Sequence, residues 1–260
     1  MGVDAVLRRV LQRDHALVVG CLLAVVAASW GWLFAGAGMP MEEMGGMLMA
    51  MSPAAWTPGY AALVVGMWAV MMAAMMLPSG APMILLFATL AQRSRARGQS
   101  AGNWGLFAGG YLAIWSVFSL AAAALQFGLE EAALISSMMQ TTSTALAGSA
   151  LVATGLYQWT PFKQACLRRC RSPLDFIVTH WRSGARGAFA MGVRHGAYCV
   201  GCCWMLMLLL FVGGVMNMAW IAGLALFVLV EKLAPAGHWI GRVAGLLLIV
   251  WGALTLYGAA

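Results

Sequence analysis

The chain has 260 residues, of which 63% are hydrophobic and only 9% are charged, and its formal net charge is +7. A soluble domain carries about a quarter charged residues, so a chain this apolar could not cover a surface facing water, and lipid is its expected solvent. The basic residues lie in clusters between apolar runs, which excludes the continuous basic face that binding to nucleic acid requires.

Apolar segments long enough to cross a bilayer follow one another along the chain. A spanning helix needs roughly 20 apolar residues. The sequence predicts an all-α fold, a polytopic bundle of about seven transmembrane helices in a single domain, 1–260. The expected spans are 17–37, 60–91, 104–125, 144–159, 196–215, 219–230 and 241–256. The first has the basic start of a signal peptide, but its apolar run is longer than a usual signal core, so we expect an uncleaved span.

The charges between these segments predict the topology. With seven spans and a cytoplasmic N-terminus, every Lys and Arg falls on the cytoplasmic side, including Lys163 in the loop 160–194 and Lys232 between the last two spans. The loop 39–53, which contains Glu42 and Glu43 but no basic residue, is then external. We expect a multi-pass protein of the bacterial cytoplasmic (inner) membrane, with the bilayer as its main partner.

The strongest chemical pattern is the run RHGAYCVGCCWMLM at the beginning of the fifth predicted span. Residues three or four apart share one face of a helix. One face therefore carries Met191, His195, Cys199, Cys202, Cys203 and Met207. Thiolates and thioethers suit Cu(I), and thiolates with imidazole also suit zinc. The alternative is a face on which small cysteines pack against a neighbouring helix.

A second cysteine pair lies in the segment TPFKQACLRRCRSP. Cys166 and Cys170 are four residues apart, so one helical turn would align them, and the predicted topology puts them in the same cytoplasmic layer as the first group. The surrounding basic residues should lower the pKa of these thiols. An incidental pair in a basic loop is the competing interpretation.

Methionines form two further patterns. The external loop carries Met39, Met41, Met44, Met47, Met49 and Met51, and it resembles the methionine-rich motifs of eukaryotic copper transporters. In the second span, Met71 and Met75 share a stripe just before Pro78, and a proline break in a span is a frequent position for a ligand site. Methionine is also a soft apolar filler, so both patterns are compatible with packing alone.

Several of these segments together resemble a known family. The runs GLYQWTPFKQACLRRCRSPLDF, HWRSGARGAFAMGVRHGAYCVGCCWMLMLLLFVGGVMNMAW and LVEK, with AVMMAAMMLPSGAP, are similar to a bacterial family of uncharacterised integral membrane proteins predicted to bind metal. Its signature is CxxxC followed by HGxYCxGCCW. The resemblance implies a metal site at Cys166, Cys170, His195, Cys199, Cys202 and Cys203.

The function that unites these patterns is binding, handling or transport of a soft metal, with copper as Cu(I) expected and zinc as the second choice. External methionines would collect the ion, the second span would pass it inward, and the cytoplasmic Cys/His cluster would receive it. A metallochaperone or copper enzyme would be the target of delivery. One alternative is a membrane-bound oxidoreductase, because Cys199 and Cys202 form a CxxC pair. Another is a metal-stabilised subunit of a larger complex. The sequence contains no nucleotide-binding or hydrolase motif, which favours a protein that is not an enzyme.

Overall fold

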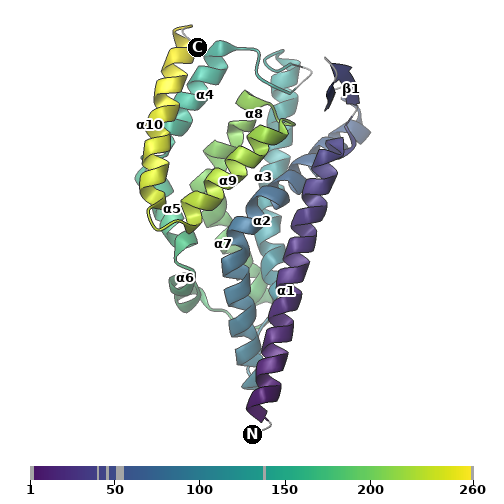
Figure 1. Ribbon diagram of the computed structural model, residues 1–260, viewed down its shortest axis with the longest axis vertical. Coiled ribbons are helices and arrows are strands. Elements are labelled where there is room, and N and C mark those ends of the chain that lie inside the picture. Colours follow the sequence, from purple (N-terminus) through teal and green to yellow (C-terminus); the bar gives the residue numbers. More distant parts are fainter. Residues whose placement is uncertain (1–2, 40, 45–46, 51–55, 137–138, 259–260) are drawn as a thin grey trace.

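The computed structural model describes residues 3–39, 41–44, 47–50, 56–136 and 139–258, and it is a bundle of helices (Figure 1). The helices are α1 (Val3–Phe34), α2 (Pro58–Ala96), α3 (Trp104–Glu131), α4 (Thr144–Tyr157), α5 (Pro161–Arg171), α6 (Pro173–His180), α7 (Gly184–Leu208), α8 (Leu210–Gly213), α9 (Met218–Leu233) and α10 (Gly237–Leu256). A single 3₁₀ turn, η1 (Gly36–Gly38), follows α1. The predicted all-α class is therefore confirmed for the bundle.

The prediction of seven spans is not confirmed. Among the described residues, five helical segments are long and apolar enough to cross a membrane: His15–Phe34, Pro58–Ala96, Trp104–Glu131, Gly184–Gly213 and Gly237–Leu256. The other two predicted spans are helices as well, but α4 has only 14 residues and α9 only 16. At 1.5 Å per residue they reach about 21 and 24 Å, less than the roughly 30 Å of a bilayer core.

The segment predicted as the basic cytoplasmic loop 160–194 is mostly helical. It contains α5, α6 and the beginning of α7. Helix α5 begins in a favourable way, because Thr160 accepts a hydrogen bond from the Lys163 N–H and Pro161 occupies the first turn. This helix packs against α7, so the two cysteine-bearing segments lie side by side.

The methionine-rich loop 39–53 contains a two-stranded antiparallel hairpin. Strands β1 (Met41–Met44) and β2 (Met47–Ala50) pair so that Met44 is opposite Met47 and Glu42 is opposite Met49. The hairpin lies beyond the C-terminal end of α1 (Figure 1). Met51 lies outside the described residues. Among the residues that the structure describes, this hairpin is a short exception to the all-α class.

Close helix packing organises the rest of the bundle. Helix α3 packs along α7, α4 along α10, and α2 against both α1 and α3. Glycines permit these approaches: a Cβ at Gly192 would lie 2.0 Å from the Phe107 carbonyl, and a Cβ at Gly155 would lie 2.5 Å from the Gly245 carbonyl. In Figure 1, α4, α9 and α10 occupy the half of the molecule near the C-terminus, whereas α1 and α2 extend to the opposite end.

Candidate metal-handling site

The predicted stripe on α7 faces the interior of the protein. Met191, His195, Cys199, Cys203 and Met207 are all buried, as is Cys202. The stripe turns toward α3, which packs along α7, and toward the α2 segment around Pro78. A face of six polarisable or polar side chains is thus enclosed by protein rather than exposed to lipid.

The segment of α2 that contains Pro78 and Pro82 meets this stripe. Because a proline lacks an N–H, Pro78 and Pro82 interrupt the backbone hydrogen bonds of α2. The carbonyl of Met76, in this segment, accepts hydrogen bonds from Ser79 Oγ and from the Tyr111 hydroxyl, each at 3.0 Å. The Met76 thioether lies 3.9 Å from Cys203 Sγ. The thioether that reaches the cysteines is therefore Met76.

Cys199 is at the centre of the polar contacts. Its Sγ lies 3.0 Å from the Tyr111 hydroxyl and 2.9 Å from the ammonium Nζ of Lys232, which is also 3.0 Å from Ser79 Oγ. Lys232 is only 6% exposed, so it is a buried charge and does not face solvent. A buried ammonium is costly unless it is paired, and here its partners are the thiol and the hydroxyl. The last turn of α9 thus brings a positive charge to the sulfur atoms.

The two cysteine segments meet at the same place. The Cys170 thiol on α5 interacts with the thiols of Cys199 and Cys202 on α7. Cys166 lies beside Gly201, where an added Cβ would come within 2.8 Å of its Sγ. We call Cys170, Cys199, Cys202, Cys203 and Met76 the sulfur cluster.

The expectation that basic neighbours lower the pKa of the α5 thiols is wrong. Contacts with Cys199 and Cys202, together with burial, raise the pKa of Cys170 well above its usual value. Burial, with a smaller effect from Cys202, raises the pKa of Cys166 as well. The arginines of α5 do not offset this, because Arg169 pairs with Asp175 and Arg171 binds carbonyls at the end of α9.

His195 lies one helical turn before Cys199. Its ring stacks on Tyr111 with centroids 5.7 Å apart and meets the edge of Phe176 at 5.4 Å. The imidazole is 3% exposed, and its Nδ1 is buried without a hydrogen-bond partner. Buried polar atoms normally have a partner, so this nitrogen is available to a ligand.

The cluster as it stands is not a closed metal site. Within the described ranges, no three Cys, His, Asp or Glu side chains are arranged so that they could hold a metal ion. The thiols of Cys202 and Cys203 donate instead to the Cys199 carbonyl, at 3.1 and 2.9 Å.

The other predicted ligands are dispersed. Met71, Met75 and Met207 are buried in the hydrophobic core, and Met39 is buried beside η1. The side chains of Met41, Met44 and Met47 lie outside the described part of the structure. Met76 was not among the predicted ligands, and sequence reasoning also missed Tyr111, Ser79 and Lys232, which contact the sulfur cluster or its partners.

A buried ion pair fixes the end of α9 next to the cluster. Lys163 Nζ lies 2.7 Å and 2.9 Å from the two carboxylate oxygens of Glu231, and both side chains are almost completely buried. The Glu231 carboxylate is therefore buried and paired. Since Glu231 precedes Lys232, the pair links α5 and α9 where each contributes to the cluster.

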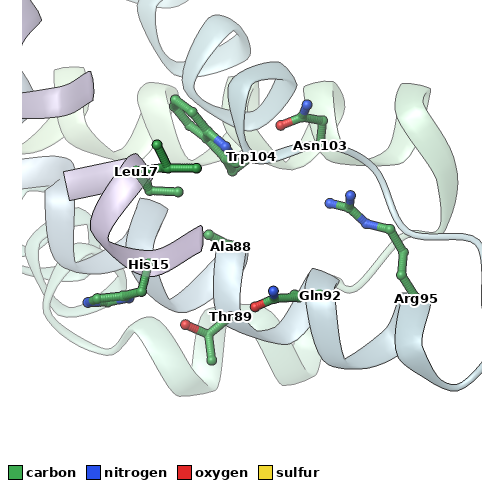
Figure 2. Close-up of a pocket in the computed structure, with 9 residues that line it drawn as sticks. His15, Leu17, Ala88, Thr89, Gln92, Arg95, Asn103 and Trp104 are labelled. Atoms are coloured by element: carbon green, nitrogen blue, oxygen red, sulfur yellow. The ribbon is translucent and has the colours of Figure 1, made fainter. Parts of the chain in front are cut away.

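A separate cavity of about 220 Å³ lies between α1, α2 and the beginning of α3 (Figure 2). Its polar lining consists of His15, Thr89, Gln92, Arg95 and Asn103, and its lining contains no sulfur atom. This cavity offers no set of soft ligands, so it does not compete with the sulfur cluster as a site for Cu(I).

Comparison with known proteins agrees with a soft-metal site. No curated protein and no solved structure matches the chain. Residues 65–255, which include every member of the sulfur cluster, match the sequence model of the PpoB2 family, described as a copper chaperone. The match covers well over half of the 260 residues, so the chain belongs to the PpoB2 copper chaperone family.

Proposed function

We propose that this protein is a multi-pass membrane protein that binds Cu(I) as cargo at the sulfur cluster and passes it to a copper-dependent partner. The observation that carries the proposal is the convergence of thiols from α5 and α7 on Cys199, with a thioether from the break of α2 beside them. Thiolate and thioether ligands favour Cu(I) over hard ions such as Mg²⁺ and Ca²⁺.

The charge of the pocket supports monovalent copper. Two thiolates around Cu(I) carry a net charge of −1, and the buried ammonium of Lys232 would neutralise it. Zn²⁺ with four thiolates would carry −2, and a single ammonium would leave half of that charge without compensation. Copper therefore fits this pocket better than zinc does.

A route for the ion follows from the methionines of α2. Met67, Met71 and Met75 form a buried stripe that leads along the helix toward Met76 and Cys203. From Met67 to Met76 the rise is about 13 Å, so an ion could move between thioethers in steps of one helical turn. We propose that Met39, Met41, Met44 and Met47 capture Cu(I) at the external end and that the cysteines receive it.

Copper titration tests the binding step. We expect the purified wild-type protein to bind Cu(I) in competition with a chromophoric chelator under reducing conditions. A Cys199→Ser/Cys203→Ser variant should lose this binding, whereas Cys21→Ser, at an exposed position on α1, should keep it. Equal copper content in all three proteins would exclude the sulfur cluster as the site.

Transfer along α2 requires a second experiment. In proteoliposomes, Met71→Leu/Met75→Leu should slow Cu(I) movement while leaving equilibrium binding at the cysteines unchanged. Cu(I) movement at the wild-type rate in this variant would exclude the methionine route, but it would leave the proposed binding site in place.

A further inference from the structure

A basic cavity of about 460 Å³ lies on the other side of α5 from the sulfur cluster. Its polar lining comes from α5 and its C-terminal end and from the beginning of α10: Gln164, Arg168, Arg171, Ser172, His238 and Arg242. Three of these side chains are guanidinium groups, and the lining includes no carboxylate. We propose that this cavity binds the phosphate of an anionic phospholipid headgroup.

The sequence of α5 explains why one short helix serves two sites. Lys163 and Cys166 are buried on the side that faces α7 and α9. Gln164, Arg168 and Arg171 recur at intervals of four and three residues, so they share the cavity side of the helix.

Arg171 is held in position before any ligand arrives. Its Nη2 donates to the carbonyls of Ala234 and Pro235 at 2.5 and 2.8 Å, and its Nη1 lies 3.5 Å from the Glu231 carbonyl. A guanidinium group has five N–H donors, so donors remain for a phosphate oxygen. A Cβ at Gly237 would lie 2.5 Å from Nη1, which shows how closely the α9–α10 turn fits around this side chain.

The other two arginines retain their charge for a ligand. Arg242 lies over the rings of Trp239 and Trp159, at 5.3 and 5.9 Å from the ring centroids. Arg168 is exposed. The ion pairs among the described residues, Lys163–Glu231 and Arg169–Asp175, involve neither of them. Guanidinium groups that have no carboxylate partner recognise phosphate well.

The position of the cavity indicates a lipid. Helix α10 has 20 residues and is about 30 Å long, close to the bilayer core, so its beginning lies at the level of the headgroups. Trp159 and Trp239 are about half exposed there, as is typical of tryptophans at a membrane interface. Farther along α10, Leu246 and Leu247 are exposed where acyl chains would run.

Helix α6 extends the same interface. Leu174 and Val178 are one turn apart and are 65% and 81% exposed, so α6 presents an apolar face to its surroundings. Free phosphate has the same charge chemistry as a lipid headgroup, but it would not cover these apolar side chains. Basic pockets beside transmembrane helices are suited to anionic headgroups.

Native mass spectrometry of the detergent-purified full chain tests this proposal. The probes are dioleoylphosphatidylglycerol, the zwitterionic dioleoylphosphatidylcholine, and inorganic phosphate. We expect phosphatidylglycerol to bind, and Arg168→Gln/Arg242→Gln to weaken its binding by about tenfold. The matched control, Arg182→Gln/Arg186→Gln, loses the same charge at exposed positions and should bind normally.

Three results would overturn the proposal: equal lipid binding by the double variant and the wild type, equal binding of the two lipids, or displacement of phosphatidylglycerol by inorganic phosphate at equal concentration. If the double variant elutes as an aggregate in gel filtration, the single variant Arg168→Gln, at an exposed position, takes its place. It should weaken binding by about threefold, and no change would contradict the proposal.

Discussion

Replacing Lys232 with methionine removes the positive charge nearest to Cys199 while keeping most of the side-chain length. In the structure the ammonium lies 2.9 Å from Cys199 Sγ and is nearly buried, so solvent screens the interaction only weakly. We expect the variant to fold, because it exchanges a buried charge for an apolar group. Its affinity for Cu(I) should fall.

The size of the expected loss in Cu(I) affinity follows from the negative charge of the copper–thiolate complex, which the ammonium of Lys232 would neutralise. Two unit charges 4 Å apart attract by about 4 kcal/mol at an effective dielectric constant of about 20. Two effects make the lost free energy of binding smaller than this. Burying the ammonium is itself costly, and the Tyr111 hydroxyl remains as a hydrogen-bond donor to Cys199. The expected loss is then about 1.5–3 kcal/mol, the usual range for hydrogen bonds to charged groups. This corresponds to about a 10- to 150-fold weaker affinity.

The assay is anaerobic competition between the protein and a chromophoric Cu(I) chelator, read by absorbance. Arg186→Met, at an exposed position on α7, is the matched control for the lost charge. Unchanged or tighter binding by Lys232→Met would refute the reasoning, since it would mean that the ammonium competes with copper for Cys199 instead of neutralising the bound state.

Three other variants or conditions test neighbouring parts of the account. Met76→Leu should weaken Cu(I) binding by about threefold to tenfold, because it removes the thioether 3.9 Å from Cys203. Glu231→Gln should destabilise the protein by about 3–5 kcal/mol, because it leaves the ammonium of Lys163 buried without a counter-charge. Alkylation of Cys166 should be slow at neutral pH and faster as pH rises, because burial raises the pKa of this thiol and only the thiolate reacts.

Each of these expectations has its own control. Met83→Leu, buried in α2 outside the sulfur cluster, should bind copper normally. Asp175→Asn breaks an exposed ion pair with Arg169 and should change stability by less than about 1 kcal/mol in a thermal unfolding assay. Equal losses in Glu231→Gln and Asp175→Asn, or a pH-independent alkylation rate at Cys166, would contradict the corresponding argument.

The helices were predictable because lipid as a solvent imposes a simple requirement, a continuous apolar run with satisfied backbone groups. The same rule predicted seven spans, and the described residues contain five helices long and apolar enough to be spans. Helices α4 and α9 are apolar but short, and they are accommodated by packing against α10 rather than by spanning alone. The length of an apolar segment can be read from the sequence, but the helix against which it packs cannot.

The α7 stripe was predictable for a comparable reason, since helical spacing alone puts His195, Cys199 and Cys203 on one face. Lys232 was missed because a lysine at the end of an apolar segment satisfies the positive-inside rule as an ordinary loop charge. Only the tertiary contact between α9 and α7 reveals it as a partner of Cys199.

The methionines of α2 show the same limit. Met71 and Met75 share a stripe that sequence can identify, but the side chain that reaches Cys203 is the adjacent Met76. The Tyr111 hydroxyl donates to the Met76 carbonyl, and this contact between α3 and α2 has no local sequence signal.

The central claim is that sulfur atoms from α2, α5 and α7 share one Cu(I) ion, and X-ray absorption at the copper K-edge tests it most directly. The account predicts a low-coordinate Cu(I) spectrum dominated by sulfur, with fewer sulfur neighbours in Cys170→Ser and an unchanged spectrum in Cys21→Ser. Copper ligated mainly by nitrogen or oxygen, or a spectrum identical in Cys170→Ser and Cys199→Ser/Cys203→Ser to that of the wild type, would contradict it.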